Sequence, residues 1–124
     1  MWMVGVEEKY LEQIFSGQKV EKHFPVRLVS CLHHWLLLRV LSPGRSRLVV
    51  GAIVLGDLLD AAVDRLAQGK TEARKFSYPI LTVVRFLSAE CFEAHCHQGI
   101  PSKVTDERVL TMSRRATADH QMSR

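Results

Sequence analysis

Residues 7–28 read EEKYLEQIFSGQKVEKHFPVRL and change from helical to strand periodicity at a single glycine. Within residues 7–16, four apolar side chains recur at helical spacing: Tyr10, Leu11, Ile14 and Phe15. This stripe predicts a short amphipathic helix. Gly17 follows the last apolar residue, where glycine is typical of a helix C-cap. In Lys19–Leu28 apolar and polar residues alternate, which predicts a strand.

Lys22 interrupts this alternation, because it falls on the side of the predicted strand that carries Phe24 and the other apolar residues. A lysine aimed at a core must either extend its ammonium to solvent or line a cavity. Lys19 lies three residues earlier, in the turn before the strand. We also expect unoccupied backbone N–H groups at the Gly17 bend. Positive charge is therefore expected to gather here, which suits a phosphate.

The rest of the chain predicts mainly strands. Four segments have the apolar content of strands: Val4–Val6, Trp35–Leu41, Leu48–Leu55 and Ile80–Leu87. Ala89–His97 is a weaker strand candidate. Gly51, inside one of the strands, predicts a bulge or a close backbone approach. Asp57–Ala67 has helical spacing and predicts a second helix, and the polar Lys70–Ser77 predicts a loop.

This order of elements predicts an α+β fold, a small mixed β-barrel with two or three short helices. Strands and helices do not alternate as they do in a doubly wound sheet. Residues 1–100 are expected to form a single domain. Beyond it the apolar content falls, so residues 101–124 are expected to be a basic C-terminal extension, partly flexible. Val104–Met112 suggests a short helix there, and Met112–Arg124 a flexible tail.

The composition is that of one globular domain. The chain has 124 residues, of which 47% are hydrophobic and 24% charged, which excludes a long disordered chain, a collagen-like repeat and a coiled coil. Lys and Arg number 17 against 13 Asp and Glu, a net charge of +4. Residues 1–50 carry seven of these basic side chains against four acidic ones. The charge permits a polyanion partner such as RNA without requiring one.

The cysteines and the N-terminus bear on the compartment. Cys31, Cys91 and Cys96 are odd in number and irregularly spaced, so they make a poor disulfide framework. The N-terminus lacks the basic and apolar segments of a signal peptide. The most apolar run, Leu48–Leu59, is too short for a membrane-spanning helix, which needs about 20 apolar residues. We therefore expect a cytoplasmic protein with no membrane partner.

Residues 9–24, KYLEQIFSGQKVEKHF, resemble the ASCH domain family, a branch of the PUA-like superfold. In that family a short helix runs into Ser-Gly-x-Lys and a strand follows. The apolar strand Val49–Val54 continues the resemblance, which covers about residues 1–60. It implies a β-barrel with a cleft where the helix end, the Gly-x-Lys turn and the next strand meet. It also implies that this cleft binds RNA or a nucleotide, and no cofactor is expected.

Some small members of the family hydrolyse N(4)-acetylcytidine with a lysine in the Gly-x-Lys turn, a threonine three residues later and a glutamate further on. The lysine falls on Lys19 and the threonine position on Lys22, a departure from that pattern. More typical members carry glutamate there and arginine two residues later, where this chain has Lys22 and Phe24. Three acids compete for the glutamate role: Asp60, Asp64 and Glu72. The candidate catalytic residues are therefore Lys19 and Lys22, and repulsion from Lys22 would lower the pKa of Lys19, as a lysine base requires.

For RNA binding, basic side chains of the strand and the following hairpin would contact phosphates. These candidates are Lys19, Lys22, His23, Arg27, Arg39, Arg45 and Arg47. Tyr10, His23 or Trp35 would then stack on a base. Three alternatives stay open. One is a hydrolase, amidohydrolase-like or ribonuclease-like, with Lys19 as its key residue. The second is a protein-interaction or regulatory module with an acidic partner. In the third, the two lysines are ordinary charges on a solvated strand edge.

Two groups of histidines and cysteines invite a metal interpretation. The first holds Cys91, His95, Cys96 and His97, and the second holds Cys31, His33 and His34. Four residues separate Cys91 from Cys96, which is the edge of the range for structural zinc ligands. If residues 89–97 form a strand, Cys91 and Cys96 face opposite sides. We therefore expect no metal site.

Overall fold

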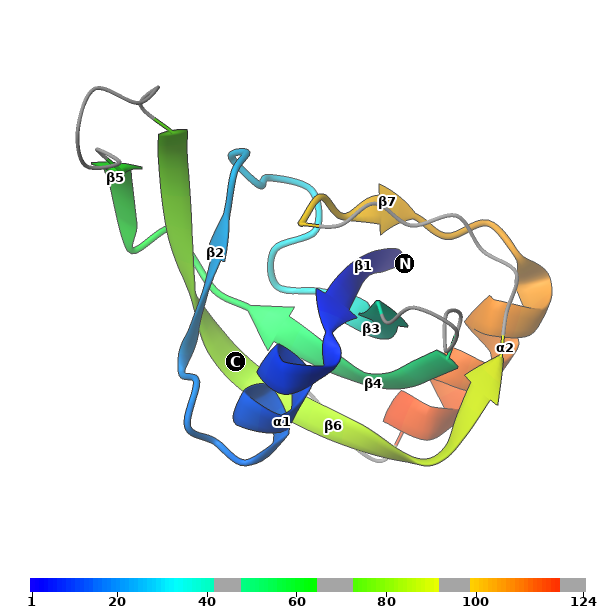
Figure 1. Cartoon of the computed structure of the whole chain (residues 1–124). Helices are drawn as coiled ribbons and strands as arrows, with labels where there is room; N and C mark the ends of the chain where they lie inside the picture. Colours follow the sequence, from blue (N-terminus) through cyan, green and yellow to red (C-terminus); the bar gives the residue numbers. More distant parts are fainter. Residues whose placement is uncertain (42–47, 65–72, 92–98, 119–124) are drawn as a thin grey trace.

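The computed structural model describes residues 1–41, 48–64, 73–91 and 99–118, with the backbone alone described for 60–64, 73–74 and 88–91. Figure 1 shows the elements in chain order. They are β1 (Trp2–Glu7), α1 (Glu8–Phe15), β2 (Glu21–Phe24), β3 (Trp35–Leu41), β4 (Leu48–Leu55), β5 (Asp60–Asp64), β6 (Ala73–Cys91), β7 (Ser102–Lys103) and α2 (Glu107–Thr117).

The strands form one curled sheet in the order β2-β6-β4-β3-β1-β7, and β5 also pairs with β6. β1 and β3 run parallel, and the other pairs are antiparallel. The long β6 joins two parts of the sheet, because its first residues pair with β2 and β5 while its later residues pair with β4. It bends along its length, so the sheet curls like part of a barrel (Figure 1). The predicted α+β class with a barrel-like sheet is confirmed.

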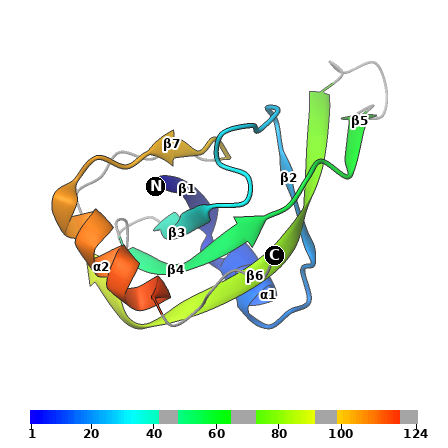
Figure 2. The ribbon, with the colours of Figure 1, turned by 180° about the vertical axis from the view of Figure 1, so that it is seen from behind.

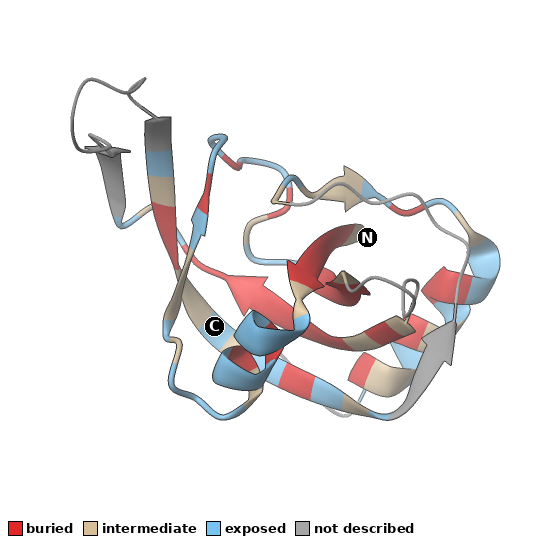
Figure 3. Ribbon diagram, in the orientation of Figure 1, coloured by how far each residue is buried: buried red, intermediate tan, exposed pale blue. Residues whose placement is uncertain are grey.

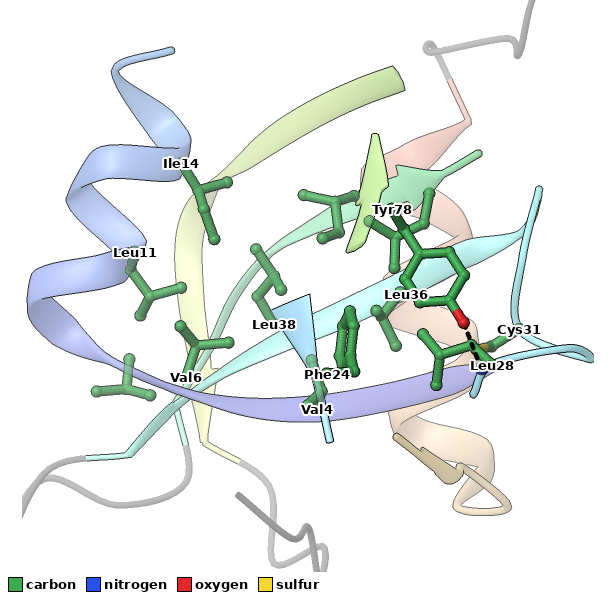
Figure 4. Packing of buried hydrophobic residues seen from close by; sticks show 13 residues of the cluster. Val4, Val6, Leu11, Ile14, Phe24, Leu28, Cys31, Leu36, Leu38 and Tyr78 are labelled. Atoms are coloured by element: carbon green, nitrogen blue, oxygen red, sulfur yellow. Dashed lines mark hydrogen bonds between the residues drawn. The ribbon is translucent and has the colours of Figure 1, made fainter. Parts of the chain in front are cut away.

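The two helices cover opposite faces of the sheet (Figures 1 and 2). Leu11 and Ile14 of α1 pack into the α1-side core, which Figure 4 shows. This core comprises Val4, Val6, Leu11, Ile14, Phe24, Leu28, Cys31, Leu36, Leu38, Val40, Ile53, Leu55 and Tyr78. Val109 and Leu110 of α2 pack into the α2-side core. Its buried members are Met3, Leu37, Val49, Ala52, Val104, Val109 and Leu110.

Residues 102–117 pack against the rest of the fold. β7 pairs with the start of β1, and the carboxylate of Asp106 accepts the N–H of Arg108 at 2.9 Å as the N-cap of α2. The sequence predicts a short helix here, which is confirmed. It also predicts a flexible tail from Met112, but α2 continues to Thr117, whose side chain is buried. The packed structure therefore extends beyond the expected domain boundary at residue 100.

The bulge predicted at Gly51 is confirmed. The register between β4 and β6 shifts between Val49 and Gly51. A Cβ atom on Gly51 would lie 2.4 Å from the carbonyl oxygen of Val84 and 2.7 Å from the ring of Phe15. Both distances are shorter than van der Waals contact. Glycine therefore lets β4 approach β6 while α1 packs over the strand.

Two predicted elements are wrong. Residues 60–64 form β5 instead of part of a helix over Asp57–Ala67, and residues 73–77 begin β6 instead of ending a loop. Asp60 pairs with Ser77 and Asp64 with Ala73, so each segment supplies the other's hydrogen-bonding partner. An isolated apolar run of this length fits a helix and a strand equally, and the partner strand decides between them. β6 also merges the separate strands expected over residues 80–87 and 89–97 as far as Cys91, and residues 92–98 lie outside the described residues.

Candidate functional site

The turn from α1 to β2 is closed by its own backbone. Gly17 has a φ of +81°, and its N–H donates to the carbonyl of Ile14 at 3.2 Å. The N–H of Lys19 donates to the carbonyl of Gln13 at 3.0 Å. These bonds satisfy carbonyls at the helix end. The C-cap residue is Ser16, and Gly17, the predicted cap, is the next residue, with the positive φ that is typical of that position. The expectation of unoccupied N–H groups is wrong for Gly17 and Lys19.

Lys22 lies on the core-facing side of β2, as the alternation predicts. Its register partner on β6 is Tyr78, and Phe24 pairs with Phe76. Phe24 and Tyr78 are 1% and 0% exposed, whereas Lys22 is partly buried. The Lys22 Nζ lies 4.9 Å from the centroid of the Phe24 ring. Along β2, Glu21 and Lys22 are of intermediate burial, His23 is exposed and Phe24 is buried, and Figure 3 shows this change along the strand.

Tyr78 fixes the apolar surroundings of Lys22. Its ring packs edge-on against Phe24, with centroids 5.9 Å apart and planes at 67°. Its hydroxyl oxygen accepts the N–H of Leu28 at 2.7 Å, the dashed line in Figure 4. This bond ties the segment after β2 to β6 and satisfies a buried amide. Sequence reasoning missed Tyr78, because only the register shows that it lies opposite Lys22.

Lys19 lies close enough to Lys22 for the two ammonium groups to repel each other. Burial, aided by repulsion from Lys19, lowers the pKa of Lys22 from 10.5 to about 8. The Lys19 Nζ lies 4.9 Å from the centroid of the Tyr10 ring. Neither lysine forms an ion pair with any carboxylate among the residues that the structure describes. We call Tyr10, Lys19, Lys22 and Phe24 the two-lysine site.

The other basic candidates do not all join this site. His23 is exposed on the opposite side of β2, and its Nε2 lies 3.8 Å from the Glu21 carboxylate. Arg27 is exposed in the segment after β2. Arg39 is only 7% exposed and pairs in register with Val49 of the α2-side core. The sheet therefore separates Arg39 from the two lysines, and its expected place beside them as a phosphate contact is wrong.

The remaining candidates are placed as follows. Arg45 and Arg47 lie outside the described residues. Tyr10 is 38% exposed next to Lys19, which leaves ring surface available. Trp35 packs partly buried against the α2-side core, away from the lysines. Lys9 is an addition that the sequence did not single out, since its Nζ also lies 4.9 Å from the Tyr10 ring centroid.

Comparison of the chain with protein-family models, with curated proteins and with solved structures finds no match. Among the candidate acids, Asp60 and Asp64 lie on β5, and Glu72 lies outside the described residues.

Among the residues that the structure describes, no group of three or more His, Cys, Asp or Glu side chains is arranged to hold a metal ion. Cys31 is a buried free thiol of the α1-side core, and burial raises its pKa. His33 and His34 are exposed, and residues 92–98, with three of the other candidate ligands, lie outside the described residues. Neither α1 nor α2 has the length and apolar character needed to cross a membrane.

Proposed function

We propose that this chain is a cytoplasmic PUA-like domain of the ASCH type that binds RNA or a nucleotide through Lys19 and Lys22. One observation carries the proposal: two neighbouring ammonium groups have no carboxylate partner among the described residues. Each ammonium raises the free energy of the other. A phosphate bound between them would supply the missing negative charge, so the site is more favourable occupied than empty.

The aromatic neighbours favour a nucleotide over a simple phosphate. Tyr10 presents a partly exposed ring beside Lys19, and a base stacked on such a ring gains about 1–3 kcal/mol. Readers of single-stranded RNA combine stacking rings with cations in this way. The family assignment is supported by the order β1-α1-β2, by the glycine that ends α1 and by the curled sheet.

Binding of a fluorescently labelled single-stranded RNA tests the proposal. Lys19→Met and Lys22→Met are each expected to weaken binding about tenfold, because each removes a charge-assisted hydrogen bond. Each is also expected to reduce the slope of log affinity against log salt by about one. Lys103→Met serves as the matched control, since Lys103 is an exposed lysine on β7. Fluorescence anisotropy at several salt concentrations gives both quantities.

Two results would speak against the site. If all three variants lost the same affinity, binding would be a property of the net charge. If none of them lost affinity, the lysines would be ordinary surface charges. Circular dichroism of each variant separates lost binding from lost folding.

A second candidate function is hydrolysis of an N-acylated nucleobase. The specific observation in its favour is the lowered pKa of Lys22, which leaves part of the amine unprotonated near neutral pH. Incubation with N(4)-acetylcytidine is expected to release cytidine only if this candidate is right. If no cytidine forms at high protein concentration and the protein binds RNA, the result would favour a binding module over a hydrolase.

A further inference from the structure

Lys22 differs from an ordinary surface lysine in what surrounds its amine. The Phe24 ring lies 4.9 Å from the Nζ, and the register partner Tyr78 is fully buried. The Tyr78 hydroxyl is engaged with the Leu28 N–H at 2.7 Å. Neither aromatic neighbour carries a negative charge at neutral pH. The Phe24 face attracts the protonated amine through this cation–π contact, but burial beside the two rings removes the water that would otherwise stabilise the charge.

In the part of the chain that the structure describes, the titratable groups near Lys22 come from its own strand, from the preceding turn and from β6. On β2, Glu21 and His23 lie 3.8 Å apart and pair with each other. The turn contributes Lys19, which opposes protonation of Lys22, and β6 contributes Tyr78. With a pKa of about 8, roughly one Lys22 amine in ten is neutral at pH 7. An ordinary lysine has far fewer neutral amines at that pH.

We propose that Lys22 is a nucleophilic amine that captures phosphate-bearing aldehydes as imines, with the Lys19 ammonium holding the phosphate. The ligand class is an aldehyde that carries a phosphate, such as a ring-opened sugar phosphate. The inference shares with the proposed function only the anion contact at Lys19. Its nucleophile at Lys22 is a separate claim and is tested separately.

The reaction is balanced without any redox partner. The neutral Nζ attacks the carbonyl carbon, and the C=O π bond opens to give a carbinolamine. Loss of one water, made from the carbonyl oxygen and the two amine hydrogens, leaves a C=N bond. Lys19 takes no part in bond formation. Desolvation of the lysine is what makes such chemistry accessible near neutral pH.

Reductive trapping tests the inference on the wild-type chain. The protein is incubated with pyridoxal 5′-phosphate, or with pyridoxal, which lacks the phosphate, and cyanoborohydride reduces each imine to a stable secondary amine. Peptide mapping by mass spectrometry then compares modification at Lys22 and at Lys103, the internal reference. At about pH 7, Lys22 is expected to react about tenfold faster than Lys103 with both reagents, since its neutral amine is more abundant.

The phosphate contributes through Lys19. The ratio of the two reagents' rates at Lys22 is expected to favour pyridoxal 5′-phosphate in the wild type and to fall to about one in Lys19→Met. Taking the ratio cancels any change in the reactivity of the Lys22 amine. Equal rates of modification at Lys22 and Lys103 would overturn the claim that Lys22 is a nucleophilic amine. A phosphate preference that survives Lys19→Met would overturn the role of Lys19. RNA binding without fast modification of Lys22 would leave the proposed function standing and remove this inference.

Discussion

Lys22→Met is expected to make the protein more stable at pH 7, by about 1–3 kcal/mol. A pKa lowered from 10.5 to about 8 means that the fold destabilises the protonated amine. Each unit of such a shift corresponds to about 1.4 kcal/mol, and the exposed end of the side chain reduces the total. Methionine keeps an unbranched side chain beside Phe24 and removes the charge. A residue that lowers stability where it stands is typical of a functional site.

The stability that Lys22→Met is expected to add depends on pH. Because the pKa of Lys22 is lower in the folded state, the folded protein binds fewer protons than the unfolded chain between pH 8 and 10.5. The free energy of unfolding of the wild type therefore rises with pH across this window, and the penalty is complete below it. Lys22→Met lacks this rise, so the two proteins converge toward pH 10.5. Urea denaturation at several pH values measures the difference. Lys103→Met is expected to follow the wild type, and a Lys22→Met protein less stable than the wild type at pH 7 would contradict the placement of Lys22.

Gly51→Val is expected to lower the free energy of unfolding by about 3 kcal/mol or more. The nearest atom to an added Cβ is the Val84 carbonyl oxygen at 2.4 Å. Because this oxygen belongs to the backbone, it cannot move aside by a change of rotamer. The Phe15 ring blocks the other direction at 2.7 Å. β4 would therefore have to move away from β6, which holds the two parts of the sheet together.

Gly17→Ala is the matched control for this prediction. A Cβ there meets nothing within 4 Å, and only the φ of +81° disfavours a side chain. We expect a loss of about 1 kcal/mol from that backbone strain. Chemical denaturation of both variants gives the comparison. A Gly51→Val protein that loses no more stability than Gly17→Ala would show that β4 and β6 are less closely packed than the structure has them.

The part of the fold that local signals specify was predictable from the sequence. The helix that ends at Gly17 rests on residue spacing and a cap, and both act within a few residues. The bulge at Gly51 follows from a glycine in an apolar strand. The core-facing side chain of Lys22 follows from strand alternation alone. These features need no knowledge of distant parts of the chain.

What depends on partners far along the chain was not predictable. β5 forms because β6 offers it hydrogen bonds, although residues 60–64 fit a helix equally well by spacing. Arg39 is buried on the face of the sheet against which α2 packs, and no residue near Arg39 in the sequence predicts that a helix lies on this face. The aromatic surroundings of Lys22 likewise depend on the pairing of β2 with β6. Register is a tertiary property, and it decides which side chains meet at the two-lysine site.

Titration of the Lys22 side chain by NMR, with and without RNA, tests the central claim most directly. In the free protein the Lys22 amine is expected to titrate with a pKa of about 8. Saturating single-stranded RNA is expected to raise that pKa by about one unit or more, because a nearby phosphate favours the protonated amine. Lys103 provides the reference in the same spectra. A Lys22 pKa near 10.5 in the free protein, or one that RNA leaves unchanged, would contradict a desolvated, anion-binding lysine at this site.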